Sequence, residues 1–288
     1  MPKSDLRGLG TAALAAAIVL LSPAAAPGGT AGPTESLGRA GGIEYLKAEF
    51  ESVVSQAGAA AVCDPGDYVL GGGGSINGDP ASAELSVIAP TDTPDDGWVA
   101  EGASTSAPRK VATYAICSSD DTEIKTATSS FSAGSEFSSG EVCDSGEVSL
   151  SGGISAGNGD TTIAAIRPDY LVFDWTNRFA VESDDSVSRH VVCTSEYSRS
   201  VKRNAVSVKR DTAAKVVRGC GRGNEVLGGG FEVDNDELQL PFEVHAMTSK
   251  PWDDPKDAKK VPEDGWLARV YNDTGSKLTL RAFAVCAA

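Results

Sequence analysis

The chain contains the same unit three times, and this repeat constrains its fold more than any other feature. Each copy begins at a cysteine that is followed by glycine at the third position, leucine at the seventh, and a glycine pair at the ninth and tenth. The copies start at Cys63, Cys143 and Cys220, which are 80 and 77 residues apart (143 − 63 and 220 − 143). A tryptophan and a closing cysteine follow in each copy. Self-similarity at a fixed period predicts three copies of one supersecondary unit.

Within each unit the apolar residues alternate with polar ones, and turn residues separate the runs. This pattern is typical of antiparallel sheets. We therefore predict an all-β fold of three pseudo-repeats of antiparallel strands. The repeats are predicted over residues 49–117, 128–193 and 203–286. The stretch from Ile43 to Val54 has apolar residues at helical spacing and is predicted as an edge strand or a short helix.

The N-terminus has the features of an export signal. Lys3 and Arg7 precede a short apolar run and then a stretch of small residues, which predicts a signal peptide over residues 1–26. The apolar run is shorter than the roughly 20 residues that a spanning helix needs, and no segment past residue 26 is long and apolar enough to span a bilayer, so no membrane span is expected. Residues 27–48, rich in glycine and proline near their start, are predicted to be a flexible linker. The expected location is secreted or extracellular, with the cell wall as one site of association.

An exported chain with six cysteines is expected to form disulfides. Spacing alone allows 15 pairings of six cysteines. The repeat favours the three pairs that lie within units, so that all six cysteines are structural. These pairs are Cys63–Cys117, Cys143–Cys193 and Cys220–Cys286. In the chain-entropy model each would contribute about 3 to 4.5 kcal/mol.

Charge excludes some functions. Asp and Glu number 40 against 25 Lys and Arg, giving a formal net charge of −15. An acidic surface repels phosphate backbones, so a nucleic-acid partner is not expected. With two histidines and no close cysteine pair, a zinc site is not expected either.

The glycine run lacks the Lys-Ser/Thr of a phosphate-binding loop. It predicts a bulge or a close backbone approach, beside a tryptophan of the same unit.

Shortly after these glycines each unit has a turn rich in Asn and Asp. Asn-Gly favours a type I′ hairpin turn, which is the first interpretation. The second is a ligand site repeated once per unit, because carboxylate and amide oxygens bind calcium and sugar hydroxyls. The candidate residues are Asn77, Asp79, Asn158, Asp160, Asp234 and Asp236, with calcium considered at Asp79, Asp160 and Asp236.

The repeated tryptophans allow two interpretations. A tryptophan at a strand start, once per repeat, favours a core anchor. The alternative is a platform on which a sugar ring stacks. The residues concerned are Trp98, Trp175 and Trp266.

A hydrolytic site is not indicated by the sequence. His190 takes the position of Tyr114 and Phe283, three residues before the closing cysteine, and is expected to be a sheet residue. His245 has no counterpart in the other units, and no Gly-x-Ser-x-Gly motif is present. The acidic clusters at 92–96, 184–185 and 253–257 are expected to be solvated loops. A glycosidase would need two carboxylates across a cleft, and the sequence does not locate such a pair.

One tract opposes the acidic trend. Eight basic residues lie between Arg199 and Arg222, and only Asp211 opposes them. The first interpretation is complementarity to an acidic surface of a neighbouring unit. The second is docking onto an anionic wall polymer.

The pattern Cys-x-x-Gly…Leu-Gly-Gly-Gly…Gly-Trp…Ala-Val-Cys resembles that of poorly characterised exported bacterial proteins of the actinobacterial type, over residues 49–288. That resemblance implies no activity. More distantly, the units resemble those of the vitelline membrane outer layer proteins. Their fold, a β-prism of three sheets about a pseudo-threefold axis, implies a β-prism-like arrangement here, although the present units are longer. A β-trefoil-like fold and three tandem small β-sandwiches are the alternatives.

The function predicted from these features is that of a secreted, non-catalytic surface or binding protein. Its expected ligand is a carbohydrate or cell-wall polymer, bound at loops repeated once per unit, with no cofactor other than calcium. The alternatives are a structural or protein-binding envelope protein and a glycan-cleaving hydrolase.

Overall fold

The computed structural model describes residues 33–52, 56–92, 96–104, 109–157, 161–169, 173–234, 243–256 and 260–288. All regular elements in these residues are β-strands, and β1 (Glu35–Ala40) precedes the three units. Unit 1 contains β2 (Ile43–Ser52), β3 (Gln56–Val62), β4 (Tyr68–Ile76), β5 (Ala83–Thr91), β6 (Gly97–Ser104) and β7 (Arg109–Ser118). Unit 2 contains β8 (Glu123–Phe131), β9 (Glu136–Val142), β10 (Val148–Ala156), β11 (Thr161–Pro168), β12 (Asp174–Val181) and β13 (Asp185–Thr194). Unit 3 contains β14 (Arg199–Val208), β15 (Thr212–Gly219), β16 (Val226–Asp234), β17 (Val244–Trp252), β18 (Gly265–Asn272) and β19 (Leu278–Ala287).

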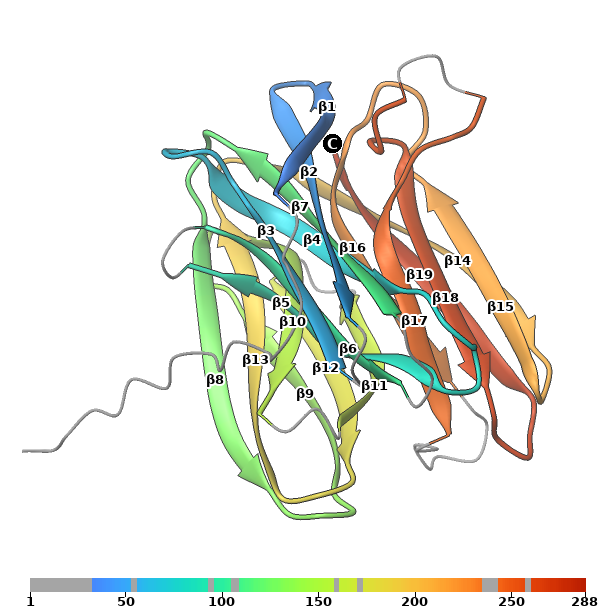
Figure 1. Cartoon of the computed structure of the whole chain (residues 1–288). Helices are drawn as coiled ribbons and strands as arrows, with labels where there is room; N and C mark the ends of the chain where they lie inside the picture. The colour runs from blue at the N-terminus through green and yellow to red at the C-terminus, as the bar shows by residue number, and fades with distance from the viewer. Residues whose placement is uncertain are drawn as a thin grey trace, which may run out of the picture.

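The strands form three antiparallel sheets, each built from two units (Figure 1). Sheet A has the order β1-β2-β7-β4-β17-β18-β15 and joins units 1 and 3. Sheet B, β3-β6-β5-β10-β13-β8, joins units 1 and 2, and sheet C, β14-β19-β16-β11-β12-β9, joins units 2 and 3. Every unit therefore gives its first, third and sixth strands to one sheet and the other three to the next. The predicted all-β, prism-like fold is confirmed, whereas tandem sandwiches would have kept the sheets within single units.

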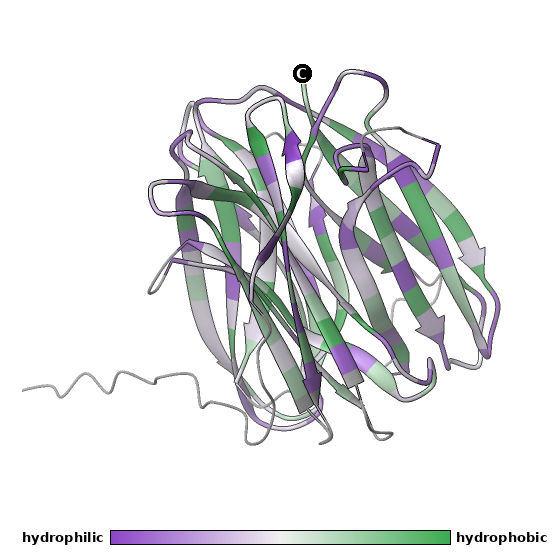
Figure 2. Cartoon of the chain, turned by 45° about the horizontal axis from the view of Figure 1, so that its top comes forward, coloured by the Kyte–Doolittle hydropathy of each residue, from purple (hydrophilic) through white to green (hydrophobic). Residues whose placement is uncertain are grey.

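The three units share one hydrophobic core, because a single cluster of buried side chains includes residues of all of them. Its largest fully buried members include the three repeated tryptophans. Many of the strands alternate between hydrophobic and hydrophilic residues along their length, while the connecting loops are largely hydrophilic (Figure 2). This alternation places one face of each sheet on the core.

A β-bulge in the third strand of each unit lies at the centre of the prism. The extra residue of each bulge is a fully buried leucine. These residues are Leu70, Leu150 and Leu227. At the next position, Ser151 Oγ donates a 2.7 Å hydrogen bond to the carbonyl of Leu70 in unit 1. The other two units have glycine there, and a Cβ would crowd a leucine carbonyl of the neighbouring unit: Gly71 against Leu227, and Gly228 against Leu150.

The next glycine of each run lies against the tryptophan of its own unit, as the sequence predicted. A Cβ at this position would overlap the indole ring and a backbone carbonyl of the adjacent strand. The pairs are Gly72 with Trp98, Gly152 with Trp175, and Gly229 with Trp266. The glycine is therefore required because the indole ring occupies the space of a side chain.

The following glycine lies where two units meet within a sheet. A Cβ here would overlap a backbone carbonyl of the neighbouring unit's strand. The pairs are Gly73 with Ser249, Gly153 with Ile88, and Gly230 with Ile166. The three successive positions of the run thus have different neighbours. The first lies against a neighbouring unit at the centre of the prism, the second against a tryptophan of its own unit, and the third against a strand of the neighbouring unit in the same sheet.

The three predicted disulfides are present, between Cys63 and Cys117, Cys143 and Cys193, and Cys220 and Cys286. Each first cysteine adjoins a strand of one sheet and each second cysteine lies in a strand of another. A disulfide therefore bridges the two sheets that its unit helps to build. Three disulfides fit an extracellular location.

The predicted linker 27–48 is wrong where the structure describes it. Residues 35–40 form β1, and residues from Ile43 onward form β2, which pairs with both β1 and β7. Gly41 and Gly42 connect β1 and β2 with φ of 57° and 86°, the positive angles that a two-residue type I′ hairpin needs. The stretch from Ile43 is accordingly an internal strand, neither helix nor edge. The predicted signal peptide, residues 1–26, lies outside the described residues.

The unit boundaries also differ from the prediction. The units begin with β2, β8 and β14, earlier than the predicted starts at residues 49, 128 and 203. Two strands, not one, precede the first cysteine of each unit, and these two strands belong to different sheets. The described residues contain no helix long and apolar enough to cross a membrane.

Candidate functional site

The first Asn/Asp turn connects two sheets and is not the predicted two-residue hairpin. Asn77 extends the ladder of β4, since its Oδ1 accepts a 2.7 Å hydrogen bond from the Lys110 amide. Asp79 orders the rest of the turn. Its Oδ1 accepts a 3.2 Å hydrogen bond from the Ala81 amide, and its backbone carbonyl accepts a 3.0 Å hydrogen bond from the Ser82 amide. The hairpin prediction fails because β4 belongs to sheet A and β5 to sheet B.

The remaining members of the predicted ligand set are only partly described. Asp234 forms an ion pair with Arg281, with 2.9 Å between Oδ2 and Nη1. Asn158, Asp160 and Asp236 lie outside the described residues. Calcium or sugar binding at those turns therefore stays a prediction.

The repeated tryptophans are core residues and cannot be stacking platforms. Trp98, Trp175 and Trp266 each have 0% exposure. Trp266 Nε1 donates a 3.0 Å hydrogen bond to Ser249 Oγ. Within the described residues, the indole N–H groups of the other two have no hydrogen-bond partner. The sugar-stacking hypothesis is wrong for all three.

The two histidines lie in β-strands, where each contacts side chains of other strands. His190 lies in β13, with Nδ1 2.9 Å from Thr126 Oγ1 and Nε2 3.1 Å from Ser155 Oγ. Burial lowers the pKa of His190 to about 4, opposed by the charge of Asp92. His245 Nδ1 lies 3.2 Å from Glu84 Oε2, a contact between units 3 and 1 that raises the pKa of His245.

Two of the acidic clusters order turns and are not simply solvated. Asp184 Oδ1 accepts a 2.8 Å hydrogen bond from the Ala133 amide. Asp185 is buried, and its Oδ1 accepts from the Gly157 amide at 3.0 Å. In the third cluster, Asp254 Oδ1 accepts from the Lys256 amide at 3.0 Å.

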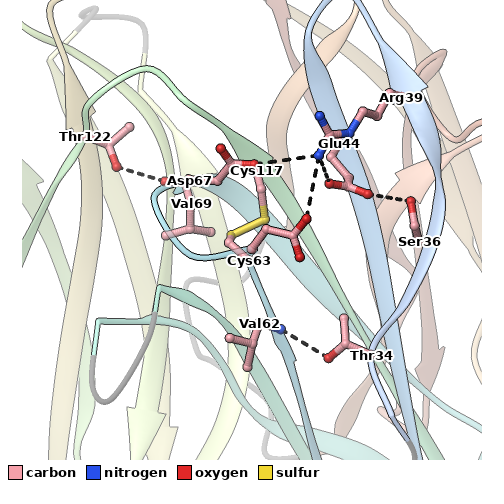
Figure 3. The surroundings of a disulfide bond; sticks show 11 residues. Thr34, Ser36, Arg39, Glu44, Val62, Cys63, Asp67, Val69, Cys117 and Thr122 are labelled. Carbon is pink, nitrogen blue, oxygen red and sulfur yellow. Dashed lines mark hydrogen bonds and ion pairs between the residues drawn. A yellow bond between two sulfur atoms is a disulfide. The ribbon is translucent and has the colours of Figure 1, made fainter.

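A cation lies over the disulfide turn of unit 1 (Figure 3). Arg39 of β1 forms an ion pair with Glu44 at 2.6 Å. The same guanidinium lies 3.7 Å from Asp64 and 3.9 Å from Asp67, the two acids of the turn that follows Cys63. The hairpin of β1 and β2 thereby covers this end of the unit.

Unit 2 has an equivalent cluster. Lys125 Nζ lies 2.8 Å from Asp144, 3.4 Å from Glu147 and 3.7 Å from Glu123. These three carboxylates are close enough together to hold a metal ion. The Lys125 ammonium supplies their counter-charge in this structure.

The turn of unit 3 breaks the pattern. Gly221 and Asn224 stand where the other units have acids, and Lys202 takes the place of Lys125 in its strand. Lys202 Nζ donates to the carbonyl of Cys220. In the described residues no carboxylate forms an ion pair with this ammonium.

A cleft of about 520 Å³ opens at this altered turn. It forms where the Cys220 turn meets the segment inserted in unit 3 before Trp266, so it combines the two features that distinguish this unit from the others. Its lining residues are Gly221, Arg222, Gly223, Asn224, Glu225, Asp254, Lys256, Glu263 and Asp264.

The β1–β2 hairpin of unit 1 packs beside the cleft. A Cβ on Gly41 would lie 2.8 Å from the carboxylate of Glu225, and one on Gly38 would lie 2.6 Å from Val261. Tyr45 donates its hydroxyl to the carbonyl of Val226 at 2.9 Å. The cleft is thus held between elements far apart in the sequence.

The basic tract covers β14, β15 and the turns beside them; β14 is an edge strand of sheet C and β15 is an edge strand of sheet A. Arg199 lies near Asp169 and Asp174 of unit 2, and burial lowers the pKa of Arg199 to about 10. The first interpretation of the basic tract, charge complementarity to acidic residues of a neighbouring unit, therefore applies to Arg199. Lys209, Lys215 and Arg222 are exposed, and no described carboxylate forms an ion pair with them.

Comparisons with known proteins do not place the chain in a family: no protein-family model matches it, and no curated protein matches it either. The cleft is therefore interpreted from its own residues. The sequence did not predict that four residues lie together around one cleft: Asn224, Lys256, Glu263 and Asp264. The one signal that points to them is the insertion between β17 and β18, the clearest departure from the repeat.

Proposed function

We propose that the chain is an exported, non-catalytic binding protein that holds a glycan or cell-wall polymer in the cleft of unit 3. Export is supported by the predicted signal peptide and by the three disulfides, which persist in oxidising compartments. The observation that carries the proposal is the cleft, which lies at the one turn where the repeat is broken.

The chemistry of the cleft favours a hydrophilic ligand. Asp254 and Asp264 supply carboxylate acceptors, while Arg222 and Lys256 supply cationic donors. Asn224 supplies both a donor and an acceptor. A sugar hydroxyl is itself donor and acceptor and matches such a lining. Among the described residues that line the cleft there is no large apolar side chain, in contrast to sites for apolar small molecules.

The test is co-sedimentation of the oxidised protein with purified bacterial walls and with insoluble neutral glycans, followed by calorimetry with soluble fragments of any glycan bound. An Asn224→Ala/Lys256→Ala variant should lose at least about tenfold in affinity, because two direct hydrogen-bonding groups are removed. The matched control is Ser145→Ala/Lys260→Ala. It alters the equivalent turn of unit 2 and a lysine of the same inserted segment, outside the cleft.

Three outcomes would contradict the proposal. Equal affinity of the cleft and control variants would place the site elsewhere, and a chelator effect would then point to the turns at Asp160 and Asp236. Release of soluble sugars would favour the glycan-cleaving hydrolase. Absence of binding to every wall and glycan would favour a structural or protein-binding envelope protein.

A further inference from the structure

A row of exposed basic side chains runs along one corner of the prism. We define the cationic strip as Lys209, Arg210, Lys215 and Arg222, all exposed on or beside strands β14 and β15. These two strands lie at the edge of the molecule (Figure 1). A ten-residue strand is roughly 33 Å long, so the strip follows the corner for about that distance, with Arg222 at the cleft.

The backbone under the strip is held in place from within the molecule. Asn204 Nδ2 donates a 3.0 Å hydrogen bond from β14 to the Val217 carbonyl of β15. Lys202 reaches from β14 to the carbonyl of Cys220. The two edge strands are therefore fixed to each other, and the basic side chains project from a rigid support.

Among the described residues, no carboxylate forms an ion pair with Lys209, Lys215 or Arg222. Arg210 forms an ion pair with its neighbour Asp211 at 2.9 Å, and both side chains are more than half exposed, so the pair is weak. Lys215 pairs directly with Arg269 across β15 and β18. Like charges at directly opposed positions destabilise a sheet. Such a pair indicates that the balancing negative charge comes from outside the chain.

We infer that the cationic strip binds a linear anionic polysaccharide, laid along the corner with one end entering the cleft at Arg222. The inference names the ligand class of the proposed function and rests on it. The strip is narrow, and the molecule as a whole carries −15, so a single thin chain can touch the corner while the remaining surface repels a bulky polyanion. Membrane binding usually adds inserted apolar side chains. Of the exposed large hydrophobic residues that the structure describes, only Val201 lies in β14 or β15.

The experiment measures binding of polygalacturonate, as the probe, at several salt concentrations. Affinity should fall as salt rises, because binding releases counterions from the polyanion. A Lys209→Glu/Lys215→Glu variant should lose at least about tenfold in affinity and show a shallower salt dependence. An Arg178→Glu/Lys260→Glu variant is the matched control, since it changes the net charge equally at two basic residues that belong neither to the strip nor to the cleft lining. It should keep most of the affinity.

Equal losses in the two variants would overturn the inference, because net charge alone would then explain binding. Tighter binding to phosphatidylglycerol vesicles or to duplex DNA than to polygalacturonate would overturn it as well. Failure of the proposed function is distinguishable. It would appear as unchanged glycan binding in Asn224→Ala/Lys256→Ala, whereas failure of the strip would appear as unchanged polygalacturonate binding in Lys209→Glu/Lys215→Glu.

Discussion

The hydroxyl of Ser151 donates a 2.7 Å hydrogen bond to the carbonyl of Leu70, and both residues are fully buried at the centre of the prism. Leu70 is the extra residue of the bulge in β4, so its carbonyl is displaced from the regular ladder. The bond joins units 2 and 1. At the corresponding contacts, units 1 and 3 present glycine in place of serine.

Ser151→Ala should lower the free energy of unfolding by about 1 to 3 kcal/mol, because the Leu70 carbonyl would be left buried without this donor. Urea denaturation measures the change. Ser86→Ala is the control, since Ser86 is also fully buried but its hydroxyl has no partner among the described residues. That change should be neutral or stabilising. A larger loss in Ser86→Ala than in Ser151→Ala would refute the assignment.

Gly152→Ala should lower stability by about 1 to 3 kcal/mol or more, because the added methyl group overlaps Trp175 and the carbonyl of His190. Near-ultraviolet circular dichroism should report a changed indole environment along with a lower melting temperature. Gly275→Ala provides the comparison, since a Cβ there meets nothing within 4 Å. If both variants melted alike, the close packing of glycine on tryptophan would not be the reason for the repeated glycines.

His190 should make the protein less stable in mild acid. Its pKa in the folded chain is about 4, below the ordinary 6.5, because burial disfavours the charged ring. The unfolded chain therefore binds a proton first, and the free energy of unfolding falls as pH decreases from about 6.5 towards 4. His190→Phe should flatten the curve in that interval while leaving carboxylate titration in place. Stability measured at several pH values in both proteins checks this, and parallel curves would rule it out.

The full chain should unfold in a single transition, because the three units share one core and every sheet contains strands of two units. A fragment of residues 199–288 should fail to fold, since its β16 and β17 pair with strands of units 2 and 1. Calorimetry of the whole chain and circular dichroism of the fragment test the point. A folded fragment would show that a unit is a domain in its own right.

The sequence predicted the interactions that lie within one unit, but not those that join different units. The match of Gly72 with Trp98, and the pairing of Cys63 with Cys117, recur in every unit and could be predicted from the repeat. The sharing of strands between units could not, because alternation shows which face of a strand is buried but not which strand lies beside it. The predicted linker failed for a related reason, since Gly41-Gly42 has the composition of both a tether and a tight turn.

The candidate site was harder to predict. The cleft brings together the turn after Cys220 and the residues Asp254, Lys256, Glu263 and Asp264, whose proximity depends on the folded sheets. The strand positions of the tryptophans favoured a core anchor and left a ligand platform as the alternative, and composition does not separate the two roles. The basic tract was visible in the sequence. Its placement on a corner, with Lys215 opposite Arg269, required the structure.

The disulfides have a consequence for how the chain withstands proteolytic cleavage. Each one ties sheet A to B, B to C, or C to A, so covalent bonds connect the three sheets in a closed circuit. The connections after β4, β5 and β6 lie between Cys63 and Cys117, and the same holds for their counterparts in the other units. A single cut in any of these loops leaves both pieces attached to the molecule. Such a chain can be nicked once in each of the three disulfide-closed loops and still remain one covalently connected particle.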